Sequence, residues 1–270
     1  SALASWARRM AIFSLVATLV SVLVVRFGFL DFRPALATFF GALALAGISI
    51  LLCFAAFAAI WQNGSRGMTR VLLALLINAL ILAYPAYLAI QYQRLPRLYD
   101  ISTDPIDPPR FDALARLRAA DGANPAAYAG LYSAEQQRKA YPNIEPVLLD
   151  LSPQRAYEMA LHLVTRRKWL IIDERPPVPP QRIGRIEAVA RTLVMGLRED
   201  VSIRITPDDD GSRVDMRSSS RYFEHDFGSN AARISAFASD LNDAADNAKP
   251  EKKIFAPAKQ QPQPKGTKRR

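Results

Sequence analysis

Three long apolar stretches dominate the first third of the chain. They cover residues 10–29, 34–61 and 71–92, and few charged residues interrupt them. A transmembrane helix needs about 20 consecutive, mostly apolar residues, and each stretch reaches that length. None of them shows the polar face that a helix on the surface of a soluble domain would carry. The sequence therefore predicts three transmembrane helices within residues 1–93.

The first stretch has a second interpretation, because Arg8 and Arg9 precede it as basic residues precede the apolar part of a secretory signal peptide. Its apolar run is longer than that of a signal peptide, no small-residue cleavage site follows it, and two further apolar stretches come after it. We therefore interpret it as a transmembrane helix.

Some residues within these stretches indicate how the helices pack. Asn78 predicts a hydrogen bond between helices, and Pro85 predicts a kink in the third helix. No chain of Asp, Glu or His crosses the stretches, so they do not predict an ion or proton path. Alanines four residues apart allow helices to approach closely, and two such pairs are Ala42 with Ala46 and Ala55 with Ala59.

The arginines at the ends of the stretches bear on how they are oriented. The first helix usually sets the orientation, and two arginines precede it, which favours an N-terminus in the cytoplasm. Three spans then place everything after residue 92 outside the cytoplasm. The full count is balanced, with Arg8, Arg9, Arg66 and Arg70 on one side and Arg26, Arg33, Arg94 and Arg97 on the other.

The remainder of the chain divides into a linker, a folded domain and a tail. Residues 94–145 are rich in Pro, Asp and Tyr and predict a strap that lies over the domain, with a short helix over 111–120. Residues 146–247 predict an α+β domain. Residues 248–270 hold eight basic residues and one acid, much of the formal net charge of +10, and predict a disordered basic tail.

Within the domain, the pattern predicts a strand, a helix, four strands and a final helix. Ser152 is a good cap for the first helix, and Pro153 suits its first position. Both helices carry one apolar stripe, and an antiparallel sheet offers them one apolar face. This order predicts an α+β sandwich. The strands are expected over 146–150, 169–174, 183–192, 200–206 and 212–220, the last two flanking an Asp-Gly turn, and the last helix over 229–247.

The other face of the predicted sheet carries charges of both signs. Ile203 and Met216 point toward the helices, so their neighbours on each strand point outward. On a solvated face such an array is typical of cross-strand ion pairs, worth under about 1 kcal/mol each. The alternative is a site for an anion or a lipid headgroup, whose candidate residues are Arg185, Arg204, Arg217 and Arg221.

Polar residues also gather where the last helix begins. Side-chain oxygens there satisfy unpaired backbone N–H groups, and a glycine permits a positive φ. We interpret this group as a helix cap and fold landmarks: Asp226, Gly228, Ser229 and Asn230. A hydrolytic triad of Ser220, His225 and Asp226 is the alternative, but adjacent side chains usually point apart and no G-x-S-x-G nucleophile elbow is present. We predict no catalytic residue here.

The chain has few residues of the kinds that hold metals. Cys53 is the only cysteine, and His162 and His225 are the only histidines. A zinc site would need carboxylates to complete its ligands, and one cysteine forms no disulfide within the chain. We therefore predict no metal site and no cofactor.

Four segments, taken in order, resemble a known family. They are YPNIEPVLLDLSPQRAYEMALHLV, GRIEAVARTL, EDVSIRI and GSRVDMRSSSRYFEHDFGSNAARISAF. Together they are similar to the bacterial and plastid family DUF1499, a domain of unknown function, over roughly residues 95–245. The apolar stretches in front of them resemble a subgroup of that family with N-terminal membrane helices.

The resemblance implies a location rather than a reaction. No established enzymatic activity comes with it, and family members often look exported. It therefore implies a multi-pass protein of a bacterial inner membrane with its soluble domain in the periplasm. The positions that carry the resemblance are landmarks, not known catalytic residues: Gly184, Arg185, Ile186, Glu187, Asp200, Arg204, Ser212, Arg213, Asp215, Arg217, Ser218, Ser220, Arg221, Asp226, Gly228, Asn230 and Arg233.

Three functions remain open. We favour a non-enzymatic, membrane-anchored module that binds an envelope partner or a lipid. Its apolar run over 192–198 is either core, which we prefer, or a patch that faces the bilayer. The second is a hydrolase or transferase acting on an envelope lipid or polymer, with acid–base chemistry from Glu187, Asp200 and Asp226. The third is binding of anionic surfaces through the tail, whose single aromatic residue, Phe255, does not suit stacking on nucleic acid.

Overall fold

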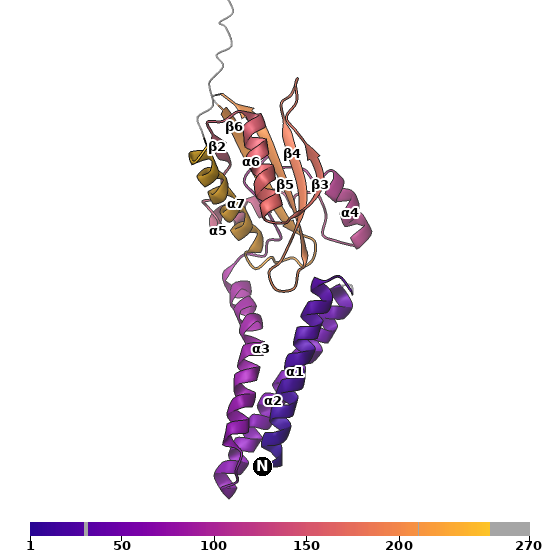
Figure 1. Ribbon diagram of the computed structural model, residues 1–270, viewed down its shortest axis with the longest axis vertical. Helices are drawn as coiled ribbons and strands as arrows, with labels where there is room; N and C mark the ends of the chain where they lie inside the picture. Colours follow the sequence, from indigo (N-terminus) through magenta and orange to yellow (C-terminus); the bar gives the residue numbers. More distant parts are fainter. Residues whose placement is uncertain (30–31, 210, 249–270) are drawn as a thin grey trace, which may run out of the picture.

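A computed structural model describes residues 1–29, 32–209 and 211–248. A bundle of three long helices stands below an α+β domain (Figure 1). Among the described residues, three helices are long and apolar enough to cross a membrane. The predicted fold class is confirmed, whereas residues 249–270 of the predicted tail lie outside the described residues. The bundle helices are α1 (Ala2–Arg26), α2 (Phe32–Asn63) and α3 (Met68–Arg94).

Small residues form the contacts within the bundle. From Ala4 to Ser14 of α1 they recur at alternating spacings of three and four residues, and Ser21 follows seven residues later, the repeat of helices that pack along a left-handed seam. Ala42 and Ala46 of α2 are buried as expected, whereas the prediction for Ala55 is wrong, because that residue is exposed. Small side chains let the helix backbones approach closely. The buried small residues are Ala4, Ala7, Ala11, Ser14 and Ser21 in α1 and Ala42, Ala46, Ser49, Cys53 and Ala56 in α2.

Side-chain hydrogen bonds add to this seam. Asn78 of α3 donates to the Ser49 hydroxyl over 2.8 Å, which confirms the predicted interhelical bond. Ser49 donates in turn to the carbonyl of Ala7 over 3.0 Å. Large apolar side chains such as Phe54 and Leu80 are exposed on the outer surface of the bundle. That distribution suits helices surrounded by lipid, where the polar groups must find partners inside the bundle.

The domain is built on one antiparallel sheet. Its strand order is β1-β6-β5-β4-β3, and β2 also pairs with β6. β1 and β2 lie end to end along the same edge of β6, because Ile101 faces Ser218 and Leu148 faces Arg213. The strap therefore contributes a strand, β1, that its irregular sequence did not predict. The strands are β1 (Asp100–Ser102), β2 (Val147–Leu149), β3 (Leu170–Arg175), β4 (Gly184–Arg191), β5 (Arg198–Asp208) and β6 (Gly211–Ser220).

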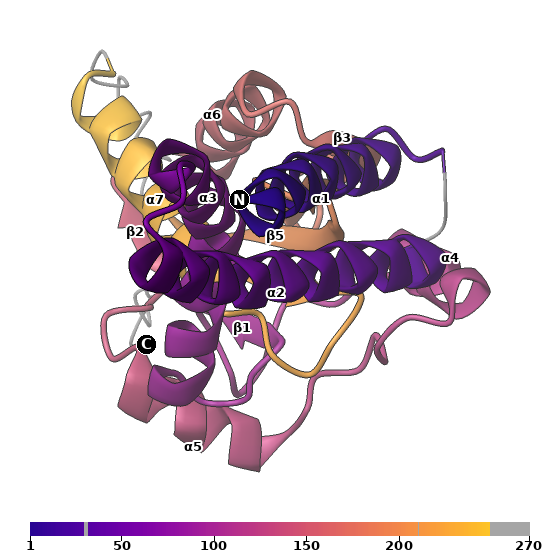
Figure 2. The ribbon, with the colours of Figure 1, turned by 90° about the horizontal axis from the view of Figure 1, so that it is seen from below.

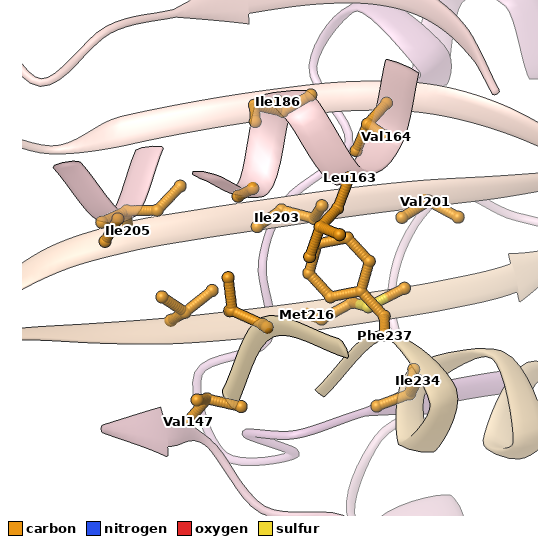
Figure 3. Close-up of a cluster of buried hydrophobic side chains, with 14 of the residues drawn as sticks. Val147, Leu163, Val164, Ile186, Val201, Ile203, Ile205, Met216, Ile234 and Phe237 are labelled. Atoms are coloured by element: carbon orange, nitrogen blue, oxygen red, sulfur yellow. The ribbon is translucent and has the colours of Figure 1, made fainter. Parts of the chain in front are cut away.

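Two amphipathic helices cover one face of the sheet, as predicted. They are α6 (Pro153–Arg166) and α7 (Ser229–Asp246). The Ser152 hydroxyl accepts the backbone N–H of Arg155, so α6 has the expected cap. Figure 3 shows the core between these layers, where Phe237 of α7 and Leu163 of α6 meet Ile203 of β5.

The strap covers the opposite face. Seen from below, α6 and α7 lie on one side of the sheet, and the strap helices α4 (Ala113–Asp121) and α5 (Leu131–Ala140) lie on the other (Figure 2). Glu187, Asp215 and Arg217 on that face are at most 2 % exposed. The expectation that this face is solvated is therefore wrong, because the strap removes it from water.

Candidate functional site

Arg217, a predicted anion-binding residue, lies in a buried ion pair under the strap. It donates to both carboxylate oxygens of Asp100, over 2.9 and 2.6 Å. The guanidinium also lies 4.3 Å from the centre of the Phe111 ring. Burial raises the pKa of Asp100 although the hydrogen bonds from Arg217 oppose this. Asp100 comes from the strap, so Arg217 already has its anion within the chain.

Asp200 makes a second buried link between strap and sheet. Arg118 of α4 donates to one of its oxygens over 2.6 Å, and Arg221 donates to the other over 2.9 Å. Arg118 also donates to the carbonyls of Asn124 and Ser219, so several acceptors hold its guanidinium group. All three charged groups of this link are at most 2 % exposed. Asp200 therefore joins the layers as an acceptor.

Glu187 holds the beginning of α4. Its carboxylate accepts the backbone N–H groups of Asp112, Ala113 and Leu114 over 2.8, 3.3 and 2.9 Å. These N–H groups have no partner within the helix, and a negative charge there is favoured by the helix dipole. Glu187 thus acts as a cap that arrives from a different layer of the domain.

Arg204 and Arg185 lie along a mixed-charge cleft of about 580 Å³ on the same face. Arg204 donates to Asp107 over 2.6 Å and to Asp215 over 3.0 Å. Burial opposes its charge, but the hydrogen bonds to Asp215 and Asp107 outweigh that effect and raise its pKa. Arg185 pairs with Asp112 over 2.9 Å. Both candidate arginines therefore have carboxylate partners.

The four residues expected at the start of α7 all make fold contacts. Asp226 accepts the N–H groups of Gly228 and Asn230, each over 2.9 Å. Gly228 has φ +84°, and a Cβ there would lie 2.9 Å from Leu95, just after α3. Ser229 donates to Glu199 over 2.6 Å, and buried Asn230 donates to the carbonyl of Tyr99 over 3.0 Å. This segment fixes α7 to the sheet and to the end of α3.

The side chains considered for hydrolysis do not converge on one site. Ser220 donates to Glu199 over 2.9 Å, whereas Nδ1 of His225 accepts the N–H of Phe227 over 2.8 Å. The His225 ring lies 5.2 Å from that of Tyr92 at the end of α3. The three carboxylates considered for acid–base chemistry serve different elements: Glu187 caps α4, Asp200 binds two arginines and Asp226 caps α7.

The apolar run after β4 forms a turn that contacts the helical bundle. Thr192 donates its N–H to the carbonyl of Leu197 over 2.9 Å. Leu193 is 87 % exposed, so the core interpretation of this run is wrong. Arg26, the last residue of α1, donates to the Leu193 carbonyl over 2.5 Å. Gly196 has φ +67°, and a Cβ there would lie 3.1 Å from the Cα of Arg26. The turn therefore sits directly on the end of α1.

Next to this turn, basic residues form a row across the end of the sheet nearest the bundle. Arg191 faces Arg198 across β4 and β5, and Arg221 donates its N–H to the Arg198 carbonyl over 3.3 Å. Lys168 lies two residues before β3, which pairs with β4. Neighbouring strands lie about 4.8 Å apart, so Arg191, Arg198 and Arg221 span about 10 Å. We call Lys168, Arg191, Arg198 and Arg221 the cationic row.

The cationic row lines a cavity of about 1110 Å³ between the domain and the bundle. Arg26, Arg33 and Arg167 also line it, and within the described residues no Asp or Glu does. Arg26 and Arg191 donate to backbone carbonyls, and Arg167 pairs with Asp240 while its Nη1 is buried with no hydrogen-bond partner. The apolar part of the lining includes Val25, Leu117, Trp169, Leu170, Ile172, Val189, Leu193 and Leu197.

We take this cavity as the candidate site. Of the four arginines predicted to bind an anion, Arg221 alone lies in its lining. A partial signal is visible in the sequence, since Arg26 and Arg33 lie at the ends of two apolar stretches and Arg191 and Arg198 flank the apolar turn. Within the described part of the chain, no three His, Cys, Asp or Glu side chains gather as metal ligands would.

Comparison with known proteins identifies a family. A family model described as a protein of unknown function, DUF1499, matches residues 100–241. The match runs from β1 into α7, so it includes the strap as well as the sheet and both covering helices. Searches of curated proteins and of solved structures found no match. The earlier resemblance is thus confirmed, and the chain belongs to the DUF1499 family of proteins of unknown function.

Proposed function

We propose that this protein is a membrane-anchored, non-enzymatic module that binds an anionic lipid where its domain meets its helical bundle. The observation that carries the proposal is the cavity lined by the cationic row, Arg26 and Arg33, with no acidic residue in its described lining. The domain would stand on the periplasmic side of a bacterial inner membrane.

The position of the cavity suits a lipid headgroup. Arg26 ends α1 and Arg33 lies at the beginning of α2, so both lie where the apolar helices would leave the hydrocarbon core. Headgroup phosphates occupy that level of a bilayer, and basic pockets beside membrane helices bind anionic headgroups. Exposed Leu193 lies at the same end of the domain.

The lining also suits a lipid. Arginine forks bind phosphate oxygens in pairs, and their strength increases where water is excluded. The apolar side chains of the lining, Trp169 and Leu170 among them, offer a surface for the glycerol and upper acyl carbons. An acidic substrate with no apolar part would leave this surface unused.

A non-enzymatic role is supported by the carboxylates. Glu187, Asp200 and Asp226 each accept two or more hydrogen bonds from the fold, and none lines the cavity. The second function considered, a hydrolase or transferase, would need one of them free to exchange a proton with a substrate. No contact favours it over lipid binding.

The periplasmic location is part of the proposal and has its own test. Arg8 and Arg9 lie just before the apolar stretch of the first helix, and the two ends of the bundle carry balanced arginines. Alkaline phosphatase fused after Asn247 folds only outside the cytoplasm. We expect it to be active, and an inactive fusion beside an active cytoplasmic reporter at the same position would reverse the orientation.

Native mass spectrometry of the full chain, released gently from its membrane, tests lipid binding. We expect adducts of phospholipid mass on the wild type. They should be reduced in the variant Lys168→Gln with Arg33→Gln, which removes two exposed cavity cations. Arg110→Gln is the matched control, since Arg110 is an exposed arginine of the other cleft. Equal adducts in all three proteins would refute binding in the cavity.

The basic tail remains a separate candidate for binding anionic surfaces. It lies outside the described residues, so no contact bears on it. A chain that ends at Asn247 should keep its lipid adducts if the cavity holds them. Loss of the adducts on this truncation would show that the tail binds the lipid.

A further inference from the structure

We infer that the lipid bound by the cavity carries two phosphate groups. This inference rests on the proposed function and names the class of ligand that the cavity selects. It follows from the number, the spacing and the surroundings of the basic residues in the lining.

The charge of the cavity favours a ligand with two phosphates. Arg167 and Arg221 have carboxylate partners, Asp240 and Asp200. Within the described part of the chain, Arg26, Arg33, Lys168 and Arg191 have none, which leaves four cations facing one cavity. A lipid with one phosphodiester brings a single negative charge. Two phosphates compensate these cations better, and they leave fewer like charges facing each other at close range.

The spacing of the basic residues also favours two phosphates. Arg191, Arg198 and Arg221 of the cationic row span about 10 Å across three neighbouring chain segments, at about 4.8 Å per strand. One phosphate, engaged by a guanidinium fork through two oxygens, reaches one or two neighbouring members of that row. Arg26 stands near one part of the row, because Arg191 donates to its carbonyl over 3.4 Å. Arg167, next to Lys168 in the chain, also lines the cavity, and its buried Nη1 has no hydrogen-bond partner. A second phosphate would reach basic residues of the lining that the first does not reach.

The phosphates could come from two sources. A soluble diphosphate and a lipid with two phosphates share the same recognition chemistry. The apolar residues in the lining and the position at the ends of α1 and α2 favour the lipid, because a soluble diphosphate would leave the exposed side chains of Leu193 and Leu170 without a partner. Cardiolipin is the bacterial lipid class that carries two phosphodiesters on one molecule.

The test compares lipids at equal phosphate. The full chain in detergent is titrated with cardiolipin or with twice the molar amount of phosphatidylglycerol, in a Trp6→Phe, Trp61→Phe background that leaves Trp169 in the cavity as the fluorescent reporter. We expect cardiolipin to bind at least about tenfold more tightly per phosphate, because its second phosphate binds as a tethered group. Native mass spectrometry of the unaltered chain gives a second readout.

Variants locate the effect. Lys168→Gln should reduce the preference for cardiolipin while phosphatidylglycerol still binds, and Arg110→Gln should change neither. Lys168 is exposed, so its variant is expected to fold. Should Lys168→Gln leave the preference intact, Arg33→Gln repeats the test from the helix side, and an intact preference in both would overturn the inference.

The remaining outcomes separate this inference from the function on which it rests. Equal binding of the two lipids at matched phosphate would overturn the two-phosphate inference and leave lipid binding in place. Competition by inorganic diphosphate as strong as by cardiolipin would keep the two-phosphate chemistry but refute the lipid source. Binding of neither lipid would overturn both.

Discussion

The basic residues around the sheet fall into two groups that differ in their partners. Away from the bundle, Arg204, Arg213 and Arg217 meet carboxylates of the strap or of their own strand. At the end nearest the bundle, Lys168 and Arg191 have no carboxylate partner among the described residues. Basic residues of one domain thus lie in two electrostatic situations.

This difference distinguishes basic residues that stabilise the fold from basic residues that are available to a ligand. A buried guanidinium needs an anion, because leaving one charge unpaired away from water costs several kcal/mol. The strap supplies that anion for Arg217 through Asp100. The cavity has no internal anion in its described lining, yet its basic residues are placed together by the packing of α1 on the turn after β4. The first group is structural, and the second is suited to an anion from outside.

Arg217→Ala should have the largest effect on stability. We expect it to destabilise the domain by about 3–5 kcal/mol, because Asp100 would remain buried without its partner. Chemical unfolding of the full chain in detergent, followed by near-UV circular dichroism, measures this. Arg110→Ala is the control, an exposed arginine expected to change the free energy of unfolding by less than about 0.5 kcal/mol. Equal stability of the two variants would contradict the structural role.

Glu187→Gln should have the next largest effect. The amide keeps one acceptor oxygen but loses the charge and one of the two oxygens that hold the N–H groups beginning α4. We expect a loss of about 1–3 kcal/mol, the range for a buried hydrogen-bonding group left unsatisfied. Relative to the wild type, hydrogen exchange in the variant should become faster in α4. It should stay unchanged in α6, which has its own cap at Ser152. Unchanged exchange in α4 would show that the strap is held without Glu187.

The unpaired cations of the cavity should contribute little to stability. Lys168→Gln with Arg33→Gln removes two exposed cations that have no carboxylate partner in the described chain. We expect the free energy of unfolding to change by less than about 1 kcal/mol while lipid binding falls. The same unfolding assay, run without added lipid, measures the first effect. A large destabilisation would place these residues in the structural group.

The smallest expected effect is a dependence on pH through Asp226. Burial raises the pKa of this carboxyl above its usual 3.8, although the N–H groups of Gly228 and Asn230 oppose the shift. The folded state then holds the proton more strongly than the unfolded state. The resulting stability is fully present below pH 3.8 and is lost as pH rises through the folded pKa.

Asp226→Asn isolates that contribution. The difference in free energy of unfolding between wild type and variant should shift in favour of the wild type as pH falls toward 4, about the ordinary pKa of Asp. Unfolding titrations at several pH values measure it. Asp209→Asn in the exposed β5–β6 turn is the control. A difference that is constant with pH, or that shifts the other way, would refute the raised pKa.

The sequence by itself determined the elements whose pattern is local. Hydropathy alone predicts α1, α2 and α3, because a spanning helix must be apolar along its length. The stripe from Ala156 to Val164 predicts α6, and Ser152 predicts where it begins. The Asp-Gly pair predicts the β5–β6 hairpin. Each of these follows from a period of 3.6 or 2 residues or from one turn, and needs no knowledge of distant segments.

Only the tertiary structure decided what the arginines do. The alternation of β6 turned Arg217 away from the apolar core, but nothing in the strand reveals that Asp100, more than a hundred residues earlier, lies against it. The cavity likewise joins Arg26 to Arg191, 165 positions apart. Whether a charged side chain is solvated, paired or left facing a cavity depends on which segments cover it, and packing over long sequence separations sets that.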